Sequence, residues 1–202
     1  MILKRNKKLN QYLFVIYAGE YFATDEDVII STVLGSCISV CIYDAINGIG
    51  GINHFMLPEN VEISEDSRIY TRDTKYGIHA MDMLINSILK KGGVRRNLEA
   101  KIFGGASYFG QGNIRRLGVR NIRFAQKYLF LEDIKLISSD VGGSEARKIL
   151  FYPQTGKVFL KRIFNQNTIQ KIDEEERVNM EDQMNVMKKR NQYIDFEDFF
   201  LK

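Results

Sequence analysis

Only four side chains in the sequence are of the types that form a thiol–imidazole pair: Cys37, Cys41, His54 and His79. A cysteine thiolate attacks carbonyl and carboxamide carbons, and a neighbouring imidazole takes the thiol proton. A cysteine–histidine pair therefore predicts acyl transfer or amide hydrolysis. Zinc ligation is the other chemistry of these residue types, but the sequence lacks the CxxC and HxxxH spacings that are typical of zinc sites. We expect no metal and no cofactor.

A β-hairpin around Asn47-Gly48 decides which of these residues can meet, because this dipeptide is a strong turn signal. A two-residue loop places Cys41 opposite His54. A four-residue loop, residues 45–48, makes His54 the diagonal neighbour of Cys37. Strand side chains alternate between faces, so the two cysteines and His54 share one face in either register. An odd loop length would place His54 on the other face.

The local sequence distinguishes the two cysteines. Cys41 lies in the middle of an apolar strand and resembles a small core residue. Cys37 follows Gly35 and Ser36 at the mouth of a turn, where unpaired backbone N–H groups can converge and bind an oxyanion. Gly35 also lets a substrate approach the backbone closely. The spacing alone leaves open that both cysteines are core residues and that His54 is a hydrogen-bonded structural side chain.

The elements that must position these residues are mostly strands. Apolar residues at helical spacing predict helices over residues 76–91 and 118–127, and a polar stretch predicts a loop over 61–73. The basic N-terminal residues are expected to lead into a first strand over 13–17. Further strand patterns cover 28–30, 38–43, 49–57, 98–103, 134–138, 149–152 and 157–163. This pattern predicts an α+β fold, with a layered β-sheet core and two or three flanking helices.

The chain divides into an expected domain over 1–163 and a charged C-terminal extension over 164–202. The extension has a net charge of −3, and the remainder has +7. Acidic residues at 173–176 and basic residues at 188–190 follow the order that a helix dipole favours, with Met180, Met184 and Met187 on one face. We expect a helical or flexible extension that is either a packed terminal helix or a segment that docks a partner.

Composition excludes several classes of protein. The chain has 202 residues, of which 45% are hydrophobic and 27% are charged, values typical of a folded globular protein. No apolar run approaches the roughly 18 residues of a membrane-spanning helix, so we expect no membrane insertion. No tight Lys/Arg cluster with interleaved aromatics indicates nucleic acid. Two cysteines cannot form a disulfide framework, and free thiols favour a cytoplasmic location.

Several short motifs follow one another over residues 16 to 163. They include Gly35-Ser36-Cys37 and, 14 residues after the cysteine, Gly51-Ile52-Asn53-His54-Phe55-Met56-Leu57-Pro58. The others are Gly19-Glu20-Tyr21, Lys75-Tyr76, Lys101-Ile102-Phe103-Gly104-Gly105-Ala106-Ser107, Gly118-Val119-Arg120-Asn121 and Asp140-Val141-Gly142-Gly143-Ser144-Glu145-Ala146-Arg147. In content and order, these blocks resemble the chemoreceptor glutamine deamidase family, CheD. The acidic tail lies outside the resemblance.

The resemblance implies hydrolysis of glutamine side-chain amides on methyl-accepting chemotaxis receptors, giving glutamate and ammonia. It implies that Cys37 is the nucleophile, that His54 is the base and that a hydroxyl residue is the third catalytic member. That third position lies six residues before the cysteine, which is Ser31 here; Thr32 is the alternative.

The resemblance also names partners. The substrate would be the cytoplasmic helical bundle of a chemoreceptor, and a CheC-type phosphatase would be a second partner. Gly104, Gly105, Ala106 and Ser107 are the candidate substrate or partner surface. A non-catalytic adaptor that binds receptor or phosphatase is the alternative from another functional class. A thiol amidohydrolase acting on small amides is a third interpretation.

Overall fold

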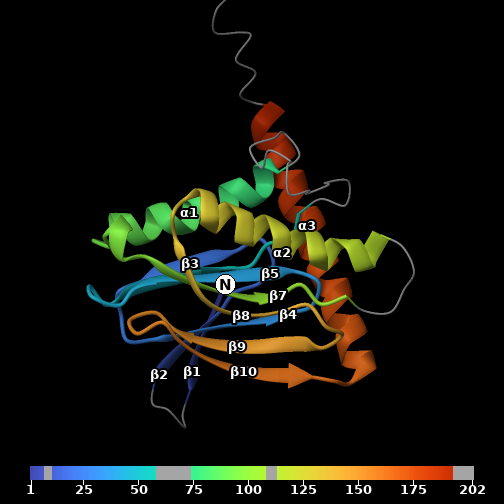
Figure 1. Ribbon diagram of the computed structural model, residues 1–202. Helices are drawn as coiled ribbons and strands as arrows, with labels where there is room; N and C mark the ends of the chain where they lie inside the picture. The colour runs from blue at the N-terminus through green and yellow to red at the C-terminus, as the bar shows by residue number, and fades with distance from the viewer. Residues whose placement is uncertain (7–10, 58–73, 108–112, 193–202) are drawn as a thin grey trace, which may run out of the picture.

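The structure is a computed structural model that describes residues 1–6, 11–57, 74–107 and 113–192. Its elements are stacked in three layers: two helices, a first β-sheet beneath them, and a second β-sheet beneath the first (Figure 1). A third helix stands upright beside the layers. The predicted α+β class with a layered sheet core is confirmed.

The outer sheet contains five strands in the order β1-β2-β4-β9-β10. Neighbouring strands are antiparallel except for β2 and β4, which are parallel. The strand bounds are β1 Ile2–Asn6, β2 Gln11–Val15, β4 Ile29–Leu34, β9 Ala146–Tyr152 and β10 Lys157–Ile163. The predicted hairpin over 149–152 and 157–163 corresponds to β9 and β10, which pair in register.

The middle sheet has the order β3-β6-β5-β7-β8, with β7 and β8 as its parallel pair. Its strands are β3 Tyr21–Thr24, β5 Ile38–Asp44, β6 Ile49–Asn53, β7 Glu99–Gly104 and β8 Lys135–Val141. Every residue of β5 is buried, because the outer sheet covers one face of this strand and the helices cover the other. A strand that is buried on both faces can carry an almost continuous apolar run.

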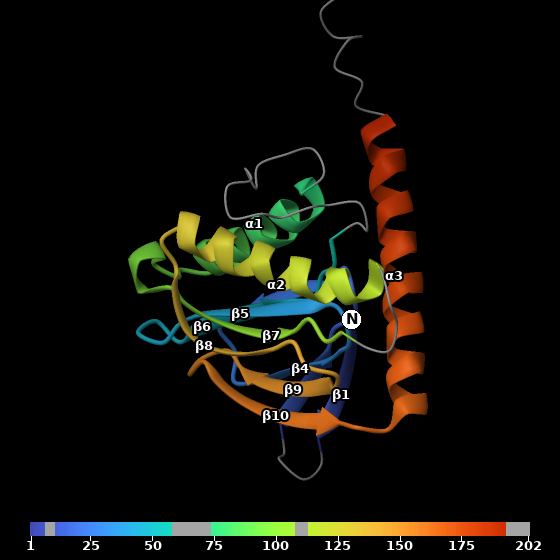
Figure 2. The same ribbon diagram turned by 45° about the vertical axis from the view of Figure 1, so that its right-hand side comes forward.

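Helices α1 (Lys75–Lys90) and α2 (Asn113–Leu131) cover the middle sheet, and a short 3₁₀ turn, η1, spans Arg95–Asn97. Helix α3 (Gln166–Gln192) runs upright along one end of both sheets (Figure 2). One apolar cluster fills the space between the middle sheet and α1 and α2, and a second fills the space between the sheets. The site described below lies at the end of the second cluster.

Two strands were missing from the sequence-based prediction. The N-terminal segment was expected to be a basic lead-in, but residues 2–6 form β1 at the edge of the outer sheet. Edge strands tolerate lysine and need no buried face, and Ile2 and Leu3 are indeed exposed. The four-residue strand β3 is likewise at a sheet edge. The predicted loop over 61–73 lies outside the described residues, as do the side chains of Met180, Met184 and Met187.

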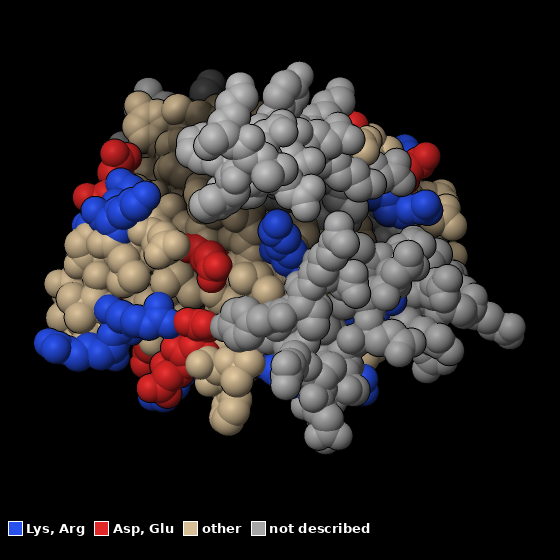
Figure 3. Space-filling model, turned by 90° about the horizontal axis from the view of Figure 1, so that it is seen from above, with Lys and Arg blue, Asp and Glu red and all other residues tan. Residues whose placement is uncertain are grey.

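The surface above α1 and α2 mixes basic and acidic side chains over its described part (Figure 3). The ion pairs Lys91–Asp25 and Arg95–Glu132 illustrate this mixing at the molecular surface. None of the helices in the described segments combines the length and apolar character needed to span a bilayer.

Candidate active site

The turn between β4 and β5 carries the chain from the outer sheet to the middle sheet. Cys37 lies at the end of this turn and its side chain joins the apolar cluster between the two sheets. The residue is fully buried, with a relative exposure of 0%. The crossover therefore places the thiol between the layers, where residues from both sheets can reach it.

The β5–β6 hairpin brings His54 to the same place. Cys41 pairs with Ile52 and Asp44 with Ile49, which leaves the four-residue loop 45–48. Gly48 in this loop has a φ of 67°, a conformation that favours glycine. This is the second of the two predicted registers, and it makes His54 the diagonal neighbour of Cys37. The predicted common face of Cys37, Cys41 and His54 is therefore confirmed.

The imidazole of His54 is held by a threonine on the opposite sheet. Thr32 Oγ1 lies 2.8 Å from His54 Nδ1 and donates its own hydrogen bond to the carbonyl of Ile16, at 2.9 Å. Because the single hydroxyl proton goes to Ile16, the threonine oxygen must accept a hydrogen bond from Nδ1–H. This arrangement leaves Nε2 as the nitrogen that can exchange a proton, and Nε2 has no hydrogen-bond partner among the described residues.

The threonine at this position is Thr32, whereas the family pattern indicated Ser31. Adjacent strand residues point to opposite faces, so only one of them can meet His54. Ser31 contributes its backbone carbonyl, which accepts a hydrogen bond from the N–H of Ile16 at 3.0 Å. The structure therefore places the alternative third member, Thr32, beside the imidazole.

The two cysteines differ in what surrounds them. Cys37 Sγ lies within 4.8 Å of both a His54 ring nitrogen and a carboxylate oxygen of Glu176. Cys41 is also fully buried, and burial raises the pKa of its thiol far above the usual range. Cys41 therefore stays a neutral core side chain, as its place in the strand predicted. Cys37 is the cysteine in position to exchange a proton with an imidazole.

Backbone donors of the turn bind one carboxylate beside the thiol. The N–H of Gly35 and the N–H of Cys37 donate hydrogen bonds to the two carboxylate oxygens of Glu176, at 2.6 and 3.2 Å. The hydroxyl of Ser36 lies 3.4 Å from the second oxygen. Such convergent donors stabilise a negatively charged oxygen, so the turn has the donors of the predicted oxyanion hole.

Two of the residues expected to form a partner surface instead donate backbone hydrogen bonds to the carbonyls of this turn. The N–H of Gly105 donates to the carbonyl of Cys37 at 2.7 Å, and the N–H of Ala106 donates to that of Gly35 at 3.0 Å. Gly104, Gly105 and Ala106 are buried, so they offer no surface to a partner in this conformation, whereas Ser107 is half-buried. Gly104 has a φ of 106°, and a Cβ there would lie 2.3 Å from the Cys37 carbonyl oxygen.

A buried asparagine on α2 adds a further brace that the sequence analysis did not identify. Asn121 Nδ2 donates to the carbonyl of Ser36 at 2.9 Å, and its Oδ1 accepts from the N–H of Leu57 at the same distance. One side chain therefore connects the nucleophile turn to the segment that follows His54. Asn121 belongs to one of the family-like motifs, but its type and spacing alone gave no indication of this role.

Glu176 on α3 is the other residue that the sequence analysis missed. The acidic residues 173–176 predicted only a favourable interaction with the dipole of their helix. Glu176 also lies 139 residues after Cys37 in the chain. In the folded chain Glu176 is 3% exposed, and its Oε1 lies 3.3 Å from His54 Nε2. Cysteine, histidine and carboxylate are also ligand types for zinc. Here, however, backbone N–H groups already bind both carboxylate oxygens.

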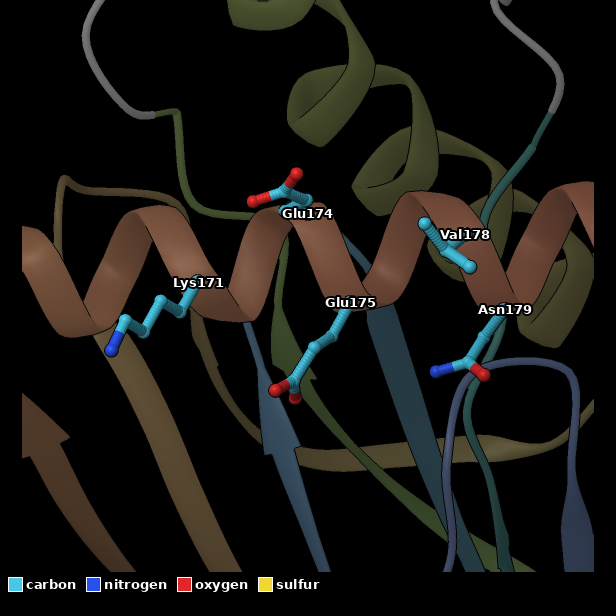
Figure 4. A pocket seen from close by; sticks show the side chains of 5 residues that line it. All are labelled: Lys171, Glu174, Glu175, Val178 and Asn179. Carbon is cyan, nitrogen blue, oxygen red and sulfur yellow. The ribbon is translucent and has the colours of Figure 1, made fainter.

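A pocket adjoins the imidazole and has α3 as one wall. His54, Thr32 and Ile16 line it from the body of the protein, and Ile172, Glu175 and Asn179 line it from α3. A second pocket lies along the same helix, and Figure 4 shows the side chains that line it: Lys171, Glu174, Glu175, Val178 and Asn179. Helix α3 therefore stands between His54 and the solvent on this side.

Known proteins resemble this chain over most of its length. The family model described as CheD chemotactic sensory transduction matches residues 56–162. A protein of Methylobacillus flagellatus, named "Probable chemoreceptor glutamine deamidase CheD", is 42% identical over 78% of this chain and 77% of its own. A protein of Hahella chejuensis with the same name is 44% identical over 76% of this chain and 71% of its own. One from Janthinobacterium sp. is 42% identical over 76% of each chain.

Proposed function

Because this chain belongs to the CheD family of chemoreceptor glutamine deamidases, we propose that it hydrolyses glutamine side-chain amides of chemoreceptors, with Cys37 as nucleophile and His54 as general base and acid. The single observation that carries this assignment is the contact of Thr32 with His54 Nδ1, because it leaves Nε2 to exchange a proton in a ring that has a nitrogen within 4.8 Å of Cys37 Sγ. Thr32 is the third member of the site in this proposal.

In the first half of the reaction, His54 Nε2 takes the proton of Cys37, and Sγ attacks the carboxamide carbon. The carbon–oxygen π bond opens, and the N–H groups of Gly35 and Cys37 bind the resulting oxyanion. When the tetrahedral intermediate collapses, the carbon–nitrogen bond breaks. The nitrogen leaves as ammonia with the proton from Nε2, and a thioester on Cys37 remains.

In the second half, water attacks the thioester carbon and gives a proton to Nε2 of His54. The second tetrahedral intermediate collapses, and the carbon–sulfur bond breaks. Sγ recovers the proton from Nε2, and the product is a glutamate side chain. The same donors of the turn stabilise both oxyanions, so the site needs no rearrangement between the two halves.

The test is incubation with a chemoreceptor cytoplasmic fragment, followed by mass spectrometry of its glutamine-containing peptides. Cys37→Ala and Cys41→Ala form a matched pair, because both cysteines are fully buried and lie four residues apart. We expect the mass gain of amide-to-acid conversion with the unaltered protein and with Cys41→Ala, and its loss with Cys37→Ala.

The other outcomes are equally informative. Loss of the mass gain only with Cys41→Ala would contradict the assignment of the nucleophile. Binding to the fragment without any mass gain would favour the non-catalytic adaptor. Conversion of free glutamine or other small amides, but not of the receptor fragment, would favour the small-amide amidohydrolase.

The cellular setting follows from the proposed substrate. The modified part of a chemoreceptor is its cytoplasmic helical bundle, so the proposal places this protein in the cytoplasm. A CheC-type phosphatase as second partner stays a prediction, for which pull-down with the purified phosphatase is the direct test. Nucleic acid has no role in the proposed reaction.

A further inference from the structure

The carboxylate of Glu176 occupies the place that a reacting amide must take. One oxygen accepts from the N–H of Cys37, as the oxyanion of a substrate would. The other accepts from the N–H of Gly35 at 2.6 Å and lies 3.3 Å from His54 Nε2, the nitrogen that would protonate the leaving ammonia. Cys37 Sγ lies within 4.8 Å of the carboxylate. A glutamate side chain is also the product of the proposed reaction, so Glu176 sits in the site as a product would.

Few of the described side chains of α3 attach the helix to the body. Among its described side chains, only Ile169 and Glu176 are buried, and they lie seven residues apart on one face. Ile172, between them, is half-buried. Ile169 packs in a small cluster with Ala106 and Ala146, separate from the two main cores. A helix that buries so little apolar area detaches at a lower free energy than the body unfolds.

We propose that the active site is a binding site for a side-chain carboxylate carried on a helix, and that its occupant in the free protein is Glu176 of α3. The helix acts as a product-like inhibitor within the same chain and must detach before a receptor glutamine can enter. This inference rests on the proposed function for its chemistry, whereas the covering of Cys37 and His54 by α3 can be tested without a receptor.

The first test measures access to the nucleophile. The full-length protein and Glu176→Ala are treated with iodoacetamide, and the alkylation rate of Cys37 is followed by mass spectrometry. Glu174→Ala is the matched control, because Glu174 lies two residues away on the exposed outer side of α3. If α3 is detached in about a tenth of the unaltered molecules or fewer and in nearly all molecules of Glu176→Ala, the substitution raises the rate by about tenfold or more. Cys41 stays unmodified because burial raises its pKa.

The second test turns the inhibitor into a substrate. Glu176→Gln places a carboxamide where the carboxylate was, with the same length and shape. Sγ of Cys37 then attacks its carbon, ammonia leaves, and water hydrolyses the thioester, so that residue 176 becomes glutamate. We expect purified Glu176→Gln protein to convert to the acid at this residue with time, and the double variant Cys37→Ala/Glu176→Gln to keep its amide.

The two tests separate this inference from the proposed function. Equal alkylation rates for the unaltered protein, Glu174→Ala and Glu176→Ala would overturn the inhibitory role of α3, whatever the receptor assay shows. Faster alkylation of Glu176→Ala without deamidation of any receptor fragment would support the covering helix and contradict the proposed substrate. A stable amide in Glu176→Gln, in a protein that deamidates receptor fragments, would show that α3 does not present residue 176 to Sγ.

Discussion

The turn that carries Cys37 and the helix that carries Glu176 touch each other, but they are held in very different ways. Three hydrogen bonds from two other elements fix the carbonyls of the turn, and all of the groups involved are buried. Helix α3 reaches the same place through one carboxylate and a small apolar cluster. The catalytic geometry therefore belongs to the rigid body, whereas access to it depends on an element of low local stability.

This difference between the turn and α3 has a chemical reason. An oxyanion hole works because its donors are already oriented before the reaction, which requires a stiff support. An inhibitor that is part of the chain must detach, so it cannot share that stiffness. Substitutions that damage the turn should therefore lower both stability and activity, and those that loosen α3 should leave global stability nearly unchanged.

The largest effect is expected from His54, whose imidazole Thr32 holds in place. His54→Gln removes the group that takes and returns protons, so kcat/KM for receptor deamidation should fall by about 10²–10⁴-fold. His79→Gln is the matched control, because His79 is exposed on α1. Similar losses in both variants, measured on the same receptor fragment, would contradict the role of His54.

A smaller but still strong effect is expected from the brace behind the nucleophile. Gly104→Ala brings a Cβ against the Cys37 carbonyl at a positive φ, so it should lower the free energy of unfolding by about 2–4 kcal/mol and reduce turnover. Gly48→Ala, also at positive φ but with nothing within 4 Å, should lose only about 1–2 kcal/mol. Urea denaturation measures the unfolding free energy of both variants. Equal losses would mean that the turn shifts at little cost to make room for the Cβ at position 104.

Thr32 should have a moderate effect on activity. Thr32→Val keeps the shape but leaves His54 Nδ1–H and the Ile16 carbonyl without their partner, and such a loss costs about 1–3 kcal/mol, which is about 5- to 150-fold in kcat/KM. Because the threonine orients the ring, the pH profile of kcat/KM should shift as well. Ser31→Ala should have little effect on either. A larger loss of kcat/KM from Ser31→Ala than from Thr32→Val would indicate that Ser31, the position given by the family pattern, is the third catalytic member.

The smallest effect on global stability is expected in α3. Ile169→Ala removes the buried apolar residue among the described side chains of the helix, so hydrogen exchange of the α3 amides should accelerate by about tenfold or more. The unfolding free energy of the body should change by less than about 1 kcal/mol. Ile149→Ala, in the core between the sheets, should instead lower global stability by about 2–5 kcal/mol. A global loss from Ile169→Ala would show that α3 unfolds together with the body.

The sequence by itself determined the part of the site that is formed by residues close together in the chain, namely Cys37, its turn and His54. The Asn47-Gly48 signal and the period-two pattern of the strands limited His54 to the face of Cys37, and both features depend only on residues close in the chain. The glycine before the nucleophile indicated a turn with free N–H groups. The β1 and β3 edge strands escaped prediction because exposed edges need no apolar pattern.

Only the tertiary structure decided the remainder of the site. Ser31 and Thr32 could not be separated until the stacking of the two sheets showed which of them meets the imidazole. The hydrogen bonds that Gly105 and Asn121 give to the turn depend on how the segment after β7 and helix α2 pack against it. Glu176 lies 139 residues after Cys37 in the chain. The charge pattern of its helix is, by itself, typical of an ordinary surface helix. Contacts between distant elements follow from how whole layers pack, and no local pattern encodes that packing.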